Sequence, residues 1–219
     1  MLEWVKAIPF RVTLDLSDNG IDSEGAALLA KALEANTIIH LDLAGNPLGA
    51  RGLELICEAL ERDSSLESFS IAGVDAGSLG IKAIARVLDS HPSLSVLNLN
   101  FNAFDDDAAA LFAAALGRNT ILTDLFMSHI GASDAGLCPL AGALKINTAL
   151  DRISLSGRGS AVRSVLPIAL AEMLGQALVV NQTLTCFHSS AETVTAEVAN
   201  MLAWLLHKIP PCDPFRRTS

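Results

Sequence analysis

The sequence lacks the features that would indicate a membrane protein or a nucleic-acid-binding protein. No apolar run reaches the ~18 uninterrupted residues that a membrane-spanning helix needs, and the nearest candidate, residues 165–180, is interrupted by Pro167, Glu172 and Gln176. The N-terminal residues show no basic segment followed by an apolar core, so we expect no signal peptide. Only 15 lysines and arginines face 24 acidic residues, and they form no basic stripe that could neutralise phosphates.

The sequence also lacks the motifs of common enzyme classes. It contains no Gly-rich phosphate loop, no H-E-x-x-H and no G-x-S-x-G, so we predict no catalytic activity and no cofactor. The four cysteines form no close pair and no C-x-x-C motif, which favours reduced thiols and a cytoplasmic location. A zinc site built from Cys186, His188, His207 and Cys212 is an alternative, but the spacing matches no common zinc motif.

The sequence does contain an internal repeat. The pattern L-x-x-L-x-L-x-x-N-x-L fits residues 38–48 at every fixed position, and residues 94–104 with Phe at the last one. The first fixed positions of five successive units recur at a constant interval, at Ile38, Leu66, Leu94, Leu122 and Leu150. One shorter unit precedes them and another begins at Leu184, after an insert of six residues. This period predicts stacked supersecondary units rather than a globule with one active-site cleft.

Each unit has two halves. The first alternates with period two, as in residues 40–44, and predicts a strand. The second is rich in Ala and Leu at helical spacing, as in residues 24–35, and predicts an amphipathic helix. Four helices end in A-L-x-x-N, where we expect asparagine in the left-handed conformation that terminates a helix, at Asn36, Asn119, Asn147 and Asn181.

The unit length, the alternation of strand and helix, and the A-L-x-x-N-T-x-L junction resemble the ribonuclease-inhibitor-like class of leucine-rich repeats. The resemblance implies an α/β solenoid, a right-handed β-α superhelix shaped like a horseshoe, with parallel strands on the concave face and helices on the convex face. The expected organisation is a short N-terminal cap at residues 1–9, about seven repeats at 10–209 and a C-terminal tail at 210–219. A final helix at 195–209 is expected to close the core, and we expect a monomer.

In that class an asparagine of each repeat forms a hydrogen-bonded ladder inside the turn after the strand. Asn19, Asn46 and Asn102 match this position. The other units have Val74, Ile130, Arg158 and Glu192 there. We therefore expect an interrupted ladder, with irregular turns after the third, fifth, sixth and seventh strands.

Residues between the buried leucines of each strand are expected to point outward and to form the binding surface. The candidate contact residues are Asp15, His40, Asp42, Asn98, Asn100, Phe101, Asp124, Phe126, Arg152 and Arg158. Aromatic residues are frequent interface anchors, so Phe126 and Phe101 rank first. A one-residue slip of the fifth unit would turn Phe126 inward, and Phe101 could instead fold into the core of its turn.

Charge is distributed unevenly along the chain. Residues 1–110 contain 17 acidic and seven basic side chains, whereas residues 111–219 contain seven acidic and eight basic ones. The acidic half either steers a basic partner or keeps an apolar solenoid soluble. Asp15 and Asp42 are predicted to stack on adjacent strands, where a cation, a basic partner or His40 could neutralise them. Arg152, Arg158 and Arg163 could receive a carboxylate or phosphate, or the insert could be a loop without a ligand.

These observations predict a non-catalytic scaffold that recognises a protein partner through its concave face. If the acidic half of the chain steers the partner, that partner is basic. We expect no binding to nucleic acid or to a membrane. Proteins of the same class supply the alternatives. One is a GTPase-activating protein resembling the Ran regulator, although the long acidic tail of that family is missing here. The others are a filament-capping role as in tropomodulins and a fragment of a bacterial effector or immune regulator. Fold alone does not decide between them.

Overall fold

The computed structural model describes residues 11–103, 105–155 and 168–188. Strands and helices alternate throughout these residues. The elements are β1 (Val12–Asp15), α1 (Ser23–Leu33), β2 (Ile38–Asp42), α2 (Gly49–Leu60), β3 (Ser68–Ser70), α3 (Gly77–Ser90), β4 (Val96–Asn98), α4 (Asp106–Arg118), β5 (Asp124–Phe126), α5 (Asp134–Ile146), β6 (Arg152–Ser154), α6 (Ile168–Val180) and β7 (Cys186–His188).

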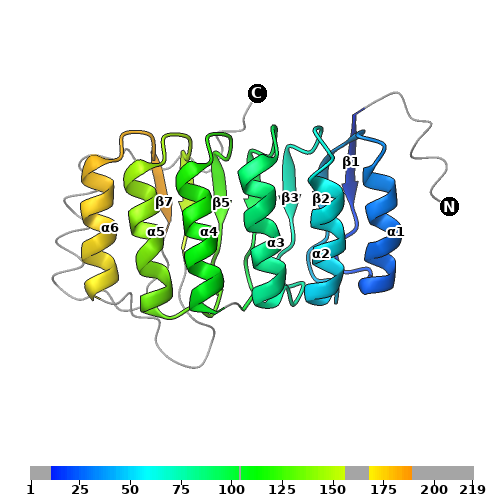
Figure 1. The fold of residues 1–219 in the computed structure, drawn as a ribbon, viewed down its shortest axis with the longest axis horizontal. Coiled ribbons are helices and arrows are strands. Elements are labelled where there is room, and N and C mark those ends of the chain that lie inside the picture. The colour runs from blue at the N-terminus through cyan, green and yellow to red at the C-terminus, as the bar shows by residue number, and fades with distance from the viewer. Residues whose placement is uncertain (1–10, 104, 156–167, 189–219) are drawn as a thin grey trace.

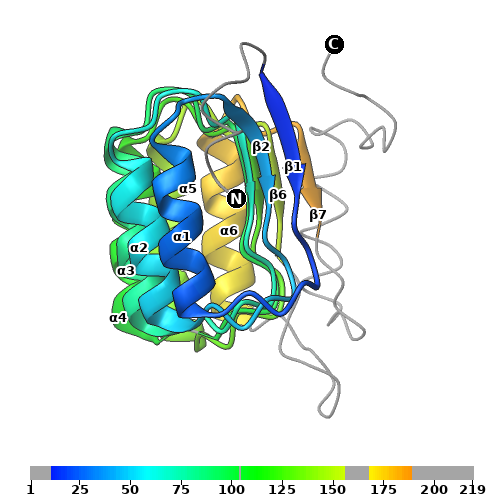
Figure 2. The same ribbon diagram turned by 90° about the vertical axis from the view of Figure 1, so that its right-hand side faces the viewer.

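The seven strands form one parallel sheet in chain order, from β1 to β7. A helix connects each pair of neighbouring strands, which is the connection that parallel pairing requires. The helices stand side by side along the molecule (Figure 1) and lie on one side of the sheet, so the molecule has two layers when viewed from its end (Figure 2). The predicted α/β repeat fold is confirmed.

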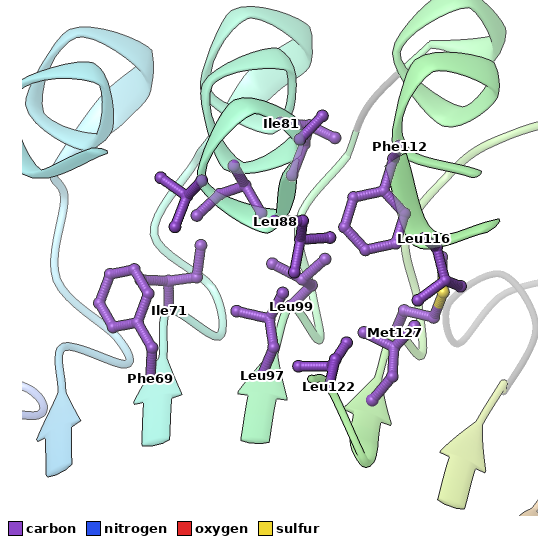
Figure 3. Close-up of a cluster of buried hydrophobic side chains, with 14 of the residues drawn as sticks. Phe69, Ile71, Ile81, Leu88, Leu97, Leu99, Phe112, Leu116, Leu122 and Met127 are labelled. Carbon is purple, nitrogen blue, oxygen red and sulfur yellow. The ribbon is translucent and has the colours of Figure 1, made fainter. Parts of the chain in front are cut away.

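The core lies between the two layers. One row of side chains runs across the middle of every strand, at Leu14, Leu41, Phe69, Leu97, Leu125, Ile153 and Phe187. Figure 3 shows Phe69 and Leu97 of the sheet below Leu88 and Phe112 of the helices, and all four are buried. Burial of each such side chain stabilises the fold by about 1.5–3 kcal/mol, so every repeat depends on its neighbours for its core.

The turns after the strands contain the expected ladder in part. The Asn46 side chain donates from Nδ2 to the carbonyl oxygens of Leu16 (2.8 Å) and Leu43 (2.9 Å), and its Oδ1 accepts from the N–H groups of Asn19 and Ile21. Asn102, in the turn after β4, makes the equivalent bonds to its own turn and to the turn after β3. Each of these buried asparagines therefore ties its own turn to the preceding one.

The turns after β3 and β5 differ, as predicted. Val74 and Ile130 replace asparagine there and are buried as apolar side chains. The residue that follows each of them, Asp75 or Gly131, has a positive φ of 56° or 74°. The residues that follow Asn46 and Asn102 do not have a positive φ, whereas Gly20, which follows Asn19, does (66°). The turns at Arg158 and Glu192 lie outside the described residues, as do residues 1–9 and 195–219, where the caps and the tail were predicted.

A second asparagine ladder runs along the turns from helix to strand, and it corrects a prediction. Asn36 has the expected left-handed φ of 51°, but Asn119 and Asn147 are extended, both with φ −68°. Asn147 Nδ2 donates to the carbonyl oxygens of Leu116 (2.7 Å) and Asn119 (2.9 Å) in the preceding repeat. Asn181 repeats this pattern toward Asn147. At these positions asparagine is needed for its side-chain amide, not for a left-handed backbone.

No helix in the described part of the chain is long and apolar enough to cross a membrane.

Candidate protein-binding surface

The outward side chains of the strands form two rows across the sheet, which together we call the strand face. The first row consists of Thr13, His40, Ser68, Val96, Asp124, Arg152 and Cys186. The second row consists of Asp15, Asp42, Ser70, Asn98, Phe126, Ser154 and His188. The middle of both rows is made mostly of small or uncharged polar side chains.

Phe126 lies on the strand face among smaller neighbours. It pairs with Asn98 on one side and Ser154 on the other, and it is half-buried. Leu125, not Phe126, belongs to the core, so the fifth unit has not slipped by one residue. The side-chain amide of Asn98 donates to Ser70 Oγ at 3.4 Å, which orients this polar neighbour of the aromatic ring.

Asp124 and Arg152 pair with each other across β5 and β6. They are direct register partners and form an ion pair between the Arg152 Nε and the Asp124 carboxylate. Thr123 Oγ1 donates to the second carboxylate oxygen of Asp124 at 2.7 Å. The Asp124 side chain is nearly inaccessible, whereas that of Arg152 is 31% exposed. Arg152 therefore offers a partner some surface, and Asp124, which the sequence analysis expected to be exposed, offers almost none.

The carboxylates of Asp15 and Asp42, which lie on adjacent strands, accept hydrogen bonds from residues of the turns that follow them. Asp15 accepts hydrogen bonds from the backbone N–H (3.0 Å) and the hydroxyl (2.7 Å) of Ser17. These two bonds lower the pKa of Asp15. Asp42 likewise accepts from the N–H of Ala44 at 2.8 Å. Among the described residues no hydrogen bond or ion pair joins His40 to either carboxylate, so local backbone donors rather than His40 stabilise the charge.

Asn98 and Asn100 are also engaged within the fold. Asn98 Oδ1 accepts from the N–H of Asn100 (3.1 Å), and Asn100 Oδ1 accepts from the N–H of Ser128 in the next repeat (2.7 Å). Both amides are thus fixed at the edge of the strand face. Arg158, the remaining candidate, lies outside the described residues.

Phe101 stacks on a histidine from the neighbouring repeat. The ring centroids of Phe101 and His129 are 4.7 Å apart and the rings are 9° from parallel. Phe101 is 63% exposed, so the alternative that it folds into the core of its turn is wrong. Both residues have a φ of 59°, in the left-handed region that bulky side chains rarely occupy.

A leucine-rich repeat family model matches residues 12–30, 34–57 and 90–113, which cover β1 with α1, β2 with α2, and β4 with α4. The chain contains leucine-rich repeats. A solved tropomodulin C-terminal domain from Caenorhabditis elegans is similar to it, with 15% identity and a TM-score of 0.52, over 72% of this chain and 91% of that one. A structure described as leiomodin-1 actin-binding site 2 shares 18% identity, with a TM-score of 0.49, over 82% and 86%. At these identities the likeness concerns the fold alone, and no curated protein matches the chain.

The leucine-rich repeat register shows what sequence reasoning missed. Equivalent turn positions hold Asp18, Gly45, Gly73, Phe101 and His129, and all five have a positive φ. At this repeat position glycine in two units is followed by an aromatic side chain in each of the next two. Because the constant repeat interval places Phe101 and His129 side by side, their pairing could have been predicted from the sequence.

The cysteines differ from the expectation of reduced thiols. Cys186 is disulfide-bonded, which also argues against it as a metal ligand. Cys57 and Cys138 are free, and burial raises the pKa of the Cys57 thiol. Within the described ranges no group of three or more His, Cys, Asp or Glu side chains is placed to hold a metal ion.

Proposed function

We propose that this chain is a non-catalytic scaffold of ribonuclease-inhibitor-like leucine-rich repeats that recognises a protein partner through the strand face, the concave face of the solenoid. The observation that supports this most directly is the position of Phe126, an outward aromatic ring surrounded by small polar side chains. Aromatic side chains in such a setting commonly dominate the affinity of an interface.

The size of the strand face fits this role. Seven parallel strands at about 4.8 Å spacing span roughly 30 Å. A standard protein interface buries ~800 Å² on each partner, which a surface of this width and a few residues' depth provides. The partner would contact Asn98, Asn100 and Phe126 near the middle of the sheet, Arg152 on β6, and the acidic pair of Asp15 and Asp42 at the N-terminal end.

The test compares one apolar side chain on each face, the half-buried Phe126 and the exposed Leu111. Phe126→Ala combined with Asp42→Arg alters the strand face, while Leu111→Ala removes a leucine on α4 that is 52% exposed on the helix side. Affinity enrichment from lysate with mass spectrometry is expected to lose one partner only with the strand-face variant, provided that circular dichroism shows both variants folded. A partner lost only with Leu111→Ala, or with neither variant, would contradict the proposal.

Actin filaments provide a defined partner for the same comparison, since filament capping as in tropomodulins is one alternative for this class and a tropomodulin domain shares the fold. Co-sedimentation that depends on Phe126 and not on Leu111 would identify actin as the partner. Absence of co-sedimentation would remove the filament-capping alternative and leave the scaffold proposal to the enrichment experiment.

A further inference from the structure

Five consecutive turns place their left-handed residues in one line, which we call the turn row: Asp18, Gly45, Gly73, Phe101 and His129. Backbone hydrogen bonds connect neighbouring turns along this line, including Phe101 N–H to the Ser128 carbonyl (2.9 Å) and Gly73 N–H to the Asn100 carbonyl (2.8 Å). The turn row therefore extends the sheet at the edge of the strand face.

Two members of the turn row are in a conformation that disfavours them. A left-handed backbone costs an L-residue with a side chain roughly 1–2 kcal/mol, which Gly45 and Gly73 avoid. Phe101 has this conformation at an exposed edge and His129 is half-buried beside it, and neither residue belongs to the hydrophobic core. Backbone strain of this kind gathers at binding sites, where a side chain must be presented in one direction.

The stack leaves one face of Phe101 open. His129 covers the face toward the fifth repeat, because the two rings are parallel and come from adjacent turns. The opposite face is directed along the turn row toward Gly73. A Cβ added at Gly73 would have only one neighbour within 4 Å, the Phe101 Cβ at 3.9 Å. The absence of a side chain at Gly73 thus leaves a slot beside the ring.

A carboxylate closes the far side of this slot. The Asp18 carboxylate occupies the space in which a side chain of Gly45 would begin. No hydrogen bond or ion pair engages that carboxylate within the part of the chain that the structure describes. It stands about two strand spacings, or roughly 10 Å, from the Phe101 side of the slot. A cation within ~6 Å of the ring centroid would therefore come within about 4 Å of the Asp18 oxygens.

We propose that the slot over Gly73, between the free face of Phe101 and the Asp18 carboxylate, receives an arginine side chain of the protein partner. The proposal rests on the protein-binding function proposed above and specifies one contact of that partner. A guanidinium is planar, so it can stack on an aromatic face and at the same time donate in its own plane to a carboxylate. A lysine ammonium cannot make both contacts at once. The excess of acidic side chains in the N-terminal half of the chain attracts such a group.

The test is an NMR titration of the full chain with acetyl-arginine amide, with acetyl-lysine amide as the comparison probe. Saturable shifts are expected at the Phe101 ring protons and the Gly73 amide, and weaker ones with lysine. Phe101→Leu keeps an apolar side chain without a π face and should weaken binding about two- to five-fold. Asp18→Asn should weaken binding and remove most of its dependence on salt.

Gly73→Asn and Gly49→Asn form the matched pair. Both glycines have positive φ, 63° and 64°, which asparagine tolerates, but only Gly73 lies in the slot. Binding is expected to disappear in Gly73→Asn and to persist in Gly49→Asn. No saturable shift in the wild type, equal affinity for the lysine probe, or shifts that survive in both Phe101→Leu and Gly73→Asn would overturn the proposal.

The two proposals fail separately. If acetyl-arginine amide binds in the slot while the Phe126→Ala/Asp42→Arg variant keeps every partner, the slot stands and the strand-face proposal fails. If the probe does not bind while that variant loses a partner, the slot is wrong and the strand-face proposal stands.

Discussion

His91 and Asp63 face each other inside the solenoid, with His91 Nε2 at 3.4 Å from Asp63 Oδ1. They occupy, in consecutive repeats, the position that asparagine fills at Asn36, Asn119, Asn147 and Asn181. Asp63 performs the acceptor half of that role, since its Oδ1 accepts from the N–H groups of Ser65 and Leu66, both at 2.8 Å. A carboxylate cannot supply the donor half, so this part of the ladder contains a charged side chain where others contain an amide.

Acid should destabilise the protein through Asp63. Burial alone would raise its pKa, but the adjacent His91 side chain and hydrogen bonds from the Leu66 and Ser65 N–H groups outweigh burial and lower it. A lowered folded-state pKa means that the unfolded chain binds the proton more tightly. The stabilisation is therefore fully present above the unfolded value of ~3.9 and is lost as pH falls through the lower folded value.

The measurement is urea unfolding between pH 7 and pH 2 for the wild type and Asp63→Asn. Asparagine keeps the acceptor oxygen and removes the titration, so the variant should lose less free energy of unfolding in acid than the wild type does. Parallel pH profiles for the two proteins would show that Asp63 does not contribute to acid sensitivity.

Asn147→Ala should be strongly destabilising. The substitution removes the amide that binds the Leu116 and Asn119 carbonyls, and it leaves the buried Leu150 N–H (2.7 Å from Asn147 Oδ1) without an acceptor. We expect a loss of about 2–4 kcal/mol in the free energy of unfolding. Asn36→Gly, at the same repeat position but exposed and left-handed, should cost less than ~1 kcal/mol. Equal losses in denaturant unfolding would refute the ladder role assigned to Asn147.

Phe101→Gly should leave stability nearly unchanged. Glycine relieves about 1–2 kcal/mol of left-handed strain, which offsets the ~0.5–1.5 kcal/mol lost with the aromatic stack. Phe69→Ala, which empties a fully buried position, should cost about 3–5 kcal/mol. Thermal or urea unfolding separates the two cases. If Phe101→Gly proves as costly as Phe69→Ala, Phe101 supports the fold rather than a binding site.

Two glycines of α5 should respond in opposite directions to alanine. A Cβ at Gly142 would have no neighbour within 4 Å, so Gly142→Ala should stabilise by about 0.5–1 kcal/mol through helix propensity and a less flexible unfolded chain. A Cβ at Gly136 would collide with the Asp106 carboxylate and lie 2.9 Å from the Asp106 Cα. Overpacking of this kind costs about 1–3 kcal/mol, and stabilisation by Gly136→Ala would contradict the close approach of α4 and α5.

The regular features of this protein follow from its sequence. A constant repeat interval with period-two and helical halves determines the parallel sheet, the layer of helices and the row to which each outward residue belongs, because strand alternation is a local property of the chain. The inward positions of Asn46 and Asn102 were implied by the resemblance to the ribonuclease-inhibitor-like class of repeats rather than by strand alternation.

Tertiary structure alone decided what each side chain touches in the next repeat. The pairing of Asp124 with Arg152, the bonds from Asn147 to the preceding turn and the stacking of Phe101 on His129 all join residues one repeat apart. A repeat pattern brings such residues close together, but side-chain rotamers and competing backbone donors determine whether they pair, repel or point to solvent. For that reason the sequence determined the surface, and the packing of adjacent repeats decided which of its residues a partner can reach.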